Sequence, residues 1–225
     1  MPLQQKAAHN PFNKFHPHSI PKDHPPTPTT MSATTADALV SYGGWNAPSR
    51  KNIAMAFLEA YTTTFFDKRD YSTEKINEWS SPDYYFQGSD GERHHGRDAA
   101  WTKIKELFGV FKSQQHAPHF AITVPITGEN DEHAKKDGRK RWLIAGFANA
   151  HFNLVDGPEG HANGKAEKVK GPDGREWDVV LHSAYRFLIV EDEKARHGGC
   201  LLEGTEIYAD PSKVFQMMQE RHMVG

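Results

Sequence analysis

The sequence lacks several features that would each have indicated a particular class of protein. Cys200 is the single cysteine among 225 residues, so no internal disulfide can form, which fits a reducing compartment. No apolar run approaches the roughly 18 residues of a membrane-spanning helix. The first residues, MPLQQKAAHNPFNKF, also lack the apolar stretch of a secretory leader. These absences predict a cytoplasmic protein that does not contact a membrane.

The chain also has no large excess of either charge. It contains 27 Lys and Arg residues and 29 Asp and Glu residues, for a net charge of -2. Nucleic-acid-binding proteins usually gather a basic excess on one face, so no nucleic-acid partner is predicted. HExxH, a cysteine pair and a run of two histidines with one carboxylate are all missing, which argues against a metal site. Neither G-x-S-x-G nor a nucleotide-binding glycine loop is found, and we predict no cofactor.

Proline is abundant only at the N-terminus, where residues 1–50 hold eight of the fourteen prolines. A polar, proline-rich segment buries too little apolar surface to offset the entropy lost on ordering. We therefore predict a disordered arm over residues 1–48 and a folded domain over residues 49–225. Residues 1–45 are expected to be dispensable for folding.

Helical spacing of apolar residues dominates the first half of the predicted domain. Ser49 is a plausible N-cap for the stretch NIAMAFLEAYTTTFF, and a short second helix is expected to stop at Pro82. After a strand at 84–87, the stretch GRDAAWTKIKELFGVF places an apolar stripe from Trp101 to Phe111 on one side of a third helix.

From residue 119 the apolar period changes from 3.6 to 2, which predicts strands. Four are expected, at 119–126, 141–155, 177–191 and 200–209, followed by a closing helix that begins near Asp210. Helices can cover only one face of such a sheet. The predicted fold is therefore α+β, a cone-shaped, strongly curved antiparallel sheet wrapped on N-terminal helices, with a cavity at the wide end.

This element order resembles the nuclear-transport-factor-2-like superfamily over roughly residues 50–222. Within it the chain is similar to the SnoaL-like (polyketide cyclase-like) group and, more distantly, to scytalone dehydratase. The dehydratase has a Tyr-Asp pair where its first helix ends, and the matching stretch FFDKRDY offers Phe66 and Asp67. Its first catalytic histidine lies after the third helix, where QQHAPHF offers His116 or His119.

Two further positions carry the comparison. The second catalytic histidine of the dehydratase follows a Gly-Tyr pair, but AGFANAH places Ala148 there and moves the nearest imidazole to His151. The polar Ser and Asn of its His-Ser-Ala-Asn run correspond to Ser183 and Tyr185 in LHSAY. One central histidine and one tyrosine are thus missing, so the resemblance implies the fold more strongly than a reaction with paired histidines.

Alternation along the strands predicts which side chains line the cavity. The candidate catalytic residues are His116 as general acid or base, Asp67 as its orienting partner, and the hydroxyls of Ser183 and Tyr185. Each has an ordinary structural alternative, and Glu206 is expected to point outward into solvent. The predicted substrate-binding residues are Phe66, Tyr85, Trp101, Trp142, Ala148, Phe152, Leu181 and Tyr208.

Two functions remain open from the sequence. One is a cofactor-free dehydratase, cyclase or isomerase that acts on a small hydrophobic, polyketide- or terpenoid-like molecule. The other is a non-catalytic ligand-binding or dimerisation module of the same fold. Leu143, Ala145 and Phe147 fall on the face opposite the cavity set, and an apolar sheet face of this kind predicts a homodimer.

Overall fold

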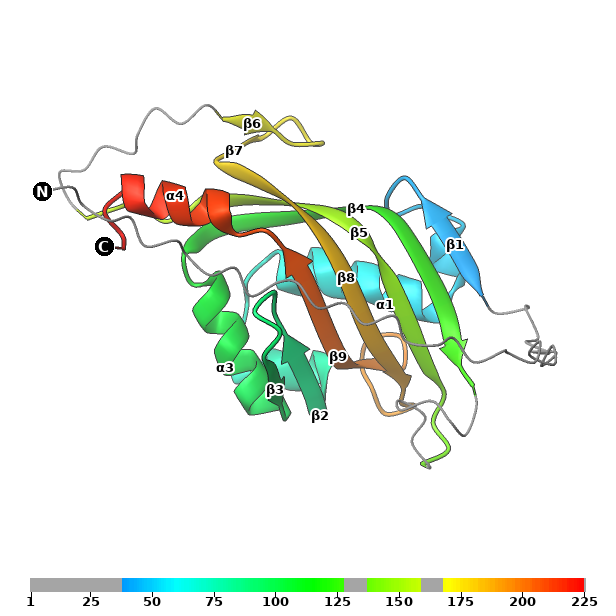
Figure 1. Cartoon of the computed structure of the whole chain (residues 1–225). Coiled ribbons are helices and arrows are strands. Elements are labelled where there is room, and N and C mark those ends of the chain that lie inside the picture. Colours follow the sequence, from blue (N-terminus) through cyan, green and yellow to red (C-terminus); the bar gives the residue numbers. More distant parts are fainter. Residues whose placement is uncertain (1–37, 128–136, 159–167, 225) are drawn as a thin grey trace, which may run out of the picture. The chain divides into compact units, whose positions relative to one another are not determined.

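A computed structural model describes residues 38–127, 137–158 and 168–224 (Figure 1). Residues 1–37, most of the predicted arm, lie outside this range. Within it, no helix is long and apolar enough to cross a membrane.

The helices begin with α1 (Ile53–Ala60), which continues directly into a six-residue π-helix, η3 (Tyr61–Phe66). The N-cap of α1 is Asn52, whose side chain accepts the N–H groups of Ala54 and Met55, whereas the predicted cap Ser49 belongs to a preceding 3-10 turn, η2 (Ser49–Lys51). The remaining helices are α2 (Thr73–Trp79), α3 (Arg97–Phe108) and α4 (Ser212–Glu220).

Seven strands form one sheet in the order β1-β4-β5-β8-β9-β2-β3. Their bounds are β1 Leu39–Tyr42, β2 Ser80–Gln87, β3 Arg93–His95, β4 Phe111–Ile126, β5 Arg141–Leu154, β8 Val179–Glu191 and β9 Cys200–Ala209. All neighbours pair antiparallel except β2 and β9, which pair parallel. A separate two-stranded sheet joins β6 (Val169–Lys170) to β7 (Glu176–Trp177).

The predicted α+β architecture is confirmed, and the four predicted strands are all present. In Figure 1 the long strands β4, β5 and β8 run side by side and bend strongly, with α1 lying across one of their faces. Register shifts at Pro118/Phe120 and Leu188/Ile189 mark irregular points in the ladders, and such bulges increase the bend of a sheet. β4 begins at Phe111, eight residues earlier than predicted, because α3 ends at Phe108 and Phe111 does not continue its stripe.

Strand β1 corrects the predicted boundary between arm and domain. It pairs with β4 from Leu39↔Thr123 to Tyr42↔Phe120, inside the segment that composition assigned to the arm. The strand has only four residues, LVSY, next to a proline-rich polar stretch, and its pairing partner lies about 80 residues away, so composition assigned it to the arm. The described domain therefore starts with β1.

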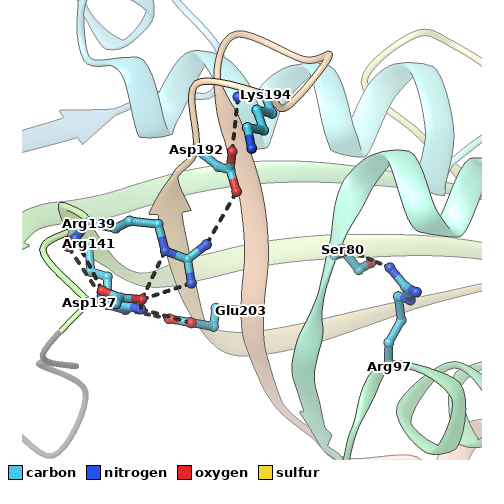
Figure 2. Close-up of polar contacts among 8 residues, drawn as sticks. All are labelled: Ser80, Arg97, Asp137, Arg139, Arg141, Asp192, Lys194 and Glu203. Carbon is cyan, nitrogen blue, oxygen red and sulfur yellow. Dashed lines mark hydrogen bonds and ion pairs between the residues drawn. The ribbon is translucent and has the colours of Figure 1, made fainter.

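A buried ion pair joins β5 to β9 across β8. The guanidinium of Arg141 donates to the carboxylate of Glu203 at 2.7 and 3.1 Å, and both side chains are only 2% exposed. Figure 2 shows that the same guanidinium also reaches Asp137, which Arg139 contacts from the other side. Arg141 holds the pKa of Asp137 well below its ordinary value. A desolvated pair of this kind requires partners for every donor, and this network supplies them.

The pairing of β1 generates a prediction about N-terminal truncation. A chain that begins at Ala38 keeps every described element and should melt at the temperature of the full-length protein. A chain that begins at Asn46 loses β1 and exposes the edge of β4. It should melt about 4–8 °C lower, the shift expected for a loss of roughly 2 kcal/mol in a chain of this size.

Thermal denaturation followed by circular dichroism measures both truncations. Equal melting temperatures for the two chains would show that β1 contributes nothing to stability and that residues 1–45 are dispensable together.

Candidate functional site

The π-helix that ends the first helical segment determines where Asp67 lies. The N–H of Asp67 donates to the carbonyl of Thr62, five residues earlier, at 2.8 Å. Within this turn, the hydroxyls of Thr63 and Thr64 donate to the carbonyls of Glu59 and Ala60, four residues earlier. Such side-chain bonds compete with the helical ladder and bend helices, and π-turns often occur at functional sites.

Asp67 and His116 form a hydrogen-bonded pair between the π-helix and β4. The Nδ1 atom of His116 lies 2.6 Å from Oδ1 of Asp67, and the backbone N–H of His116 donates to Oδ2 at 3.1 Å. The side chain of His116 is 17% exposed and that of Asp67 is 12% exposed. Because a carboxylate can only accept, Nδ1 carries a proton, and in the neutral imidazole Nε2 is the atom with the lone pair. The sequence prediction that Asp67 could orient His116 is compatible with this geometry.

A second set of hydrogen bonds fixes the chain on either side of Asp67. The amide of Gln114, which is 3% exposed, donates to the carbonyl of Phe66 at 2.8 Å and to the hydroxyl of Tyr71 at 2.9 Å. Its Oε1 accepts from Arg69 at 3.2 Å. Arg69 has a φ of 60°, in the left-handed region that non-glycine residues rarely occupy. Gln114 lies two residues before His116, so one strand holds both the imidazole and the loop that carries its partner.

The His116 ring lines a cavity of about 450 Å³ between the helices and the curved sheet, within the size range of small-molecule sites. Most of its walls are apolar. The apolar lining includes Leu58, Phe66, Phe86, Ile104, Phe108, Phe111, Ala148, Ala150, Phe152, Leu181, Phe187, Ile207, Val214 and Met218. Val214 and Met218 come from α4, so the closing helix forms part of the cavity wall.

Ser183 and Tyr185 also line the cavity, but backbone carbonyls already accept their protons. Ser183 donates to Ala148 at 3.3 Å, and Tyr185 donates to Phe120 at 3.2 Å. Burial raises the pKa of Tyr185 to about 12, so its hydroxyl stays protonated at neutral pH. Neither hydroxyl is therefore free to donate to a ligand without giving up a backbone partner.

Of the predicted substrate-binding residues, Phe66, Ala148, Phe152 and Leu181 line the cavity, and four do not. Two of these four face the outer side of the sheet. The hydroxyl of Tyr85 donates to Glu206 at 2.9 Å, and Tyr208 is 44% exposed. The alternation along β2 and β9 puts Tyr84 and Ile207 on the cavity side instead. Glu206 points outward as predicted, yet it is 3% exposed rather than solvated, because Arg93 and the two tyrosines surround it.

The other two lie in the core, away from the cavity. The indole N–H of Trp101 donates to the Ser80 hydroxyl at 2.9 Å, and that of Trp142 donates to Glu191 at 2.8 Å. Both rings are at most 3% exposed. Large aromatic side chains on a cavity-facing stripe can equally fill a core, and the sequence pattern does not separate the two.

Sequence reasoning missed several cavity residues with polar side chains. Tyr84, Thr205 and Trp45 are among them, and Tyr61, Thr62, Ser89, Asp90 and Glu106 also line the cavity. The hydroxyls of Tyr84 and Thr205 are buried without a well-formed hydrogen bond, although Thr205 is near enough to lower the pKa of Tyr84 slightly. Burial raises the pKa of Tyr84 overall, so it is a neutral donor. The alternation of Tyr84 with Phe86 on the predicted strand 84–87 was the signal that could have found it.

The alternative imidazoles lie elsewhere. His119 is exposed and is the residue without a partner on β5 at the irregularity between Pro118 and Phe120. His151 is 4% exposed and pairs with Gln115 on the outer side of the sheet, and burial lowers its pKa. His116 is thus the one imidazole that lines the cavity among the described residues. No group of three metal-ligating side chains is found in that part of the chain.

No protein-family model matches the sequence, and no curated protein matches it significantly. Among solved structures, the chain is similar to a putative SnoaL-like polyketide cyclase from Jannaschia sp., at 14% identity and a TM-score of 0.44. The match covers 81% of this chain and 100% of that one.

Two other solved structures are similar at the same level. A putative SnoaL-like polyketide cyclase from Shewanella denitrificans has 9% identity and a TM-score of 0.38, with 77% of this chain and 98% of that chain covered. An uncharacterized protein with a cystatin-like fold from Caulobacter vibrioides has 16% identity and a TM-score of 0.43, with coverage of 76% and 97%. These similarities concern the fold.

The cavity generates a prediction about Ala148, a small residue in its wall. Ala148→Trp should fill the cavity and abolish ligand binding while the protein stays folded, since the void accommodates the added ring. Ala100, fully buried on α3 and not part of the cavity lining, is the matched control. Ala100→Trp should overpack the core and destabilise it by about 3 kcal/mol or more.

Denaturant unfolding compares the two variants with the wild type. A loss of stability in Ala148→Trp as large as that in Ala100→Trp would show that Ala148 belongs to a filled core.

Proposed function

We propose that this protein binds a small hydrophobic molecule in the cavity and that His116 removes a proton from the bound molecule. The observation that carries this proposal is the His116–Asp67 hydrogen bond at the wall of an apolar cavity. Asp67 holds the proton on Nδ1, so Nε2 is the basic atom. Apolar walls with few polar groups favour a hydrophobic ligand that is oriented by those groups.

The reaction class that fits is proton abstraction from a carbon next to a carbonyl, the step shared by dehydratases, cyclases and isomerases of polyketide- or terpenoid-like molecules. Nε2 of His116 takes the proton, and Asp67 stabilises the imidazolium that forms. The protonated hydroxyl of Tyr84, which lines the same cavity, is a further neutral donor available to a polar group of the ligand. This chemistry requires no cofactor.

The alternative is a ligand-binding module without catalysis. One observation favours it: Ala148 stands where the dehydratase that the sequence resembles has its second histidine, and His116 is the sole imidazole in the described cavity wall. A single base can still exchange a proton, but a reaction that needs a separate acid would lack one. Binding and proton transfer therefore have to be measured separately.

We also propose that two copies of the chain associate through the outer face of the sheet. Cross-strand partners form a row across five strands of this face: Tyr42, Phe120, Phe147, Ala184 and Tyr208. Tyr42 and Phe147 are 72% and 55% exposed. An apolar row through the middle of a sheet suits a second identical row across a two-fold axis, because each copy offers the same surface.

The catalytic proposal predicts base-catalysed hydrogen exchange in a bicyclic ketone probe. In D₂O, the wild type should accelerate deuterium incorporation at C2 of 1-tetralone, as followed by proton NMR. His116→Gln should lower the acceleration by about 100-fold, the range of general-base contributions. Asp67→Asn should lower it less, because the imidazole remains while its tautomer is no longer fixed.

His119→Gln removes an exposed imidazole three residues along the same chain segment and is the matched control. It should leave exchange unchanged. Binding of 1-tetralone without any exchange above that of His116→Gln would rule out catalysis by His116 and favour the ligand-binding module.

The association proposal predicts that a charge in the apolar row separates the copies. Phe147→Glu should give a monomer by light scattering at tens of micromolar, on the order of ordinary dimer affinities, while the wild type gives a dimer. Val169→Glu, a change at an exposed apolar residue of the β6–β7 sheet, should leave the dimer intact. A wild-type monomer at that concentration would contradict the proposal.

A further inference from the structure

The loop that connects β1 to the first helix has a fixed conformation. Gly43 and Gly44 have φ values of 78° and 84°, which glycine adopts without strain. The N–H of Gly43 donates to the carbonyl of His119 on β4 at 2.9 Å. The loop is therefore attached to the strand that carries His116.

Asn46 holds the rest of this loop together. Its side-chain amide donates to the carbonyls of Tyr42 and Gly44 at 3.1 and 3.2 Å, and its Oδ1 accepts the N–H of Ser49 at 2.9 Å. The hydroxyl of Ser49, which is 1% exposed as a residue, donates to the Asn46 carbonyl in return. These bonds set the backbone on both sides of Trp45 without using the Trp45 side chain.

Trp45 itself forms part of the cavity wall, next to the strand of the His116–Asp67 pair. A Cβ atom on the preceding residue, Gly44, would lie 3.5 Å from the carbonyl oxygen of Pro118, so the loop runs against β4 at that point. Pro118 lines the cavity too, two residues beyond His116. The loop thus runs beside β4, the strand that carries His116, and adds Trp45 to the lining of the cavity.

The indole nitrogen of Trp45 is buried and has no hydrogen-bond partner among the described residues. An indole N–H can only donate, so it needs an acceptor oxygen. A buried donor without an acceptor is costly, and such groups in folded proteins are usually satisfied by a bound molecule when the protein does not satisfy them. The indole donors of Trp101 and Trp142 have oxygen acceptors, whereas that of Trp177, which does not line the cavity, has none among the described residues.

We infer that the N–H of Trp45 donates to an acceptor oxygen of the ligand. The ligand class is then an apolar molecule of one or two rings that carries a carbonyl oxygen on the side facing β4. This inference rests on the proposed function, since it takes the cavity as the ligand site. It adds that recognition depends on residue 45, which composition alone assigns to the N-terminal arm.

The experiment compares two ligands that share a skeleton and differ in the oxygen. 1-Tetralone carries a ketone, and tetralin is the same bicyclic hydrocarbon without it. Trp45→Phe keeps an aromatic ring in the loop and removes the N–H. By calorimetry, this substitution should weaken 1-tetralone binding about five- to tenfold, as expected for the loss of one hydrogen bond in a closed site, and change tetralin binding less than about twofold.

A measurement on the wild type alone provides a second readout that does not depend on the folding of a variant. In proton–nitrogen correlation spectra, the indole resonance of Trp45 should move downfield with 1-tetralone and not with tetralin. Equal weakening of both ligands in Trp45→Phe, or equal indole shifts, would overturn the inference and leave the proposed function intact. Failure of the wild type to bind either ligand would overturn both.

Discussion

The hydrogen bonds between the end of the first helical segment and β4 hold the candidate site together. The π-helix places Asp67 opposite His116, and Gln114 on the same strand binds the carbonyl of Phe66 next to it. Tertiary packing compensates the left-handed backbone of Arg69, because its guanidinium is bonded to Gln114. If this connection were lost, the imidazole would keep its position on the strand but lose the carboxylate that fixes its proton.

The cavity places the His116–Asp67 pair where a bound molecule can reach it. Apolar walls from both the sheet and the helices lower the local dielectric, so polar groups inside the cavity interact more strongly than they would in solvent. Ser183 and Tyr185 are already bonded to backbone carbonyls, whereas Tyr84 and Trp45 are donors that lack well-formed partners. The arrangement is therefore one imidazole, held by a carboxylate, with neutral donors around a largely apolar volume whose lining also includes Asp90 and Glu106.

Part of this site could be predicted from the sequence. Asp67 and His116 were proposed because the stretches FFDKRDY and QQHAPHF resemble those that carry site residues in scytalone dehydratase, and Ala148 and Phe152 because of the alternation along a long strand. Tyr85, Tyr208 and the two core tryptophans were placed in the cavity wrongly. Short strands such as 84–87 give too few residues to determine which side faces inward, and aromatic side chains suit both faces of a curved sheet.

The sequence by itself determined the order of the four helices and of the strands β2, β4, β5, β8 and β9, because the period of apolar residues depends only on neighbours along the chain. It also determined that the chain has one cysteine and nearly balanced charge. Only the tertiary structure decided that β1 belongs to the sheet, that Glu206 is buried on its outer face, and that Trp45 lies at the cavity. Each of these depends on a contact between residues far apart in the chain, and the energy of such a contact has no local sequence signature.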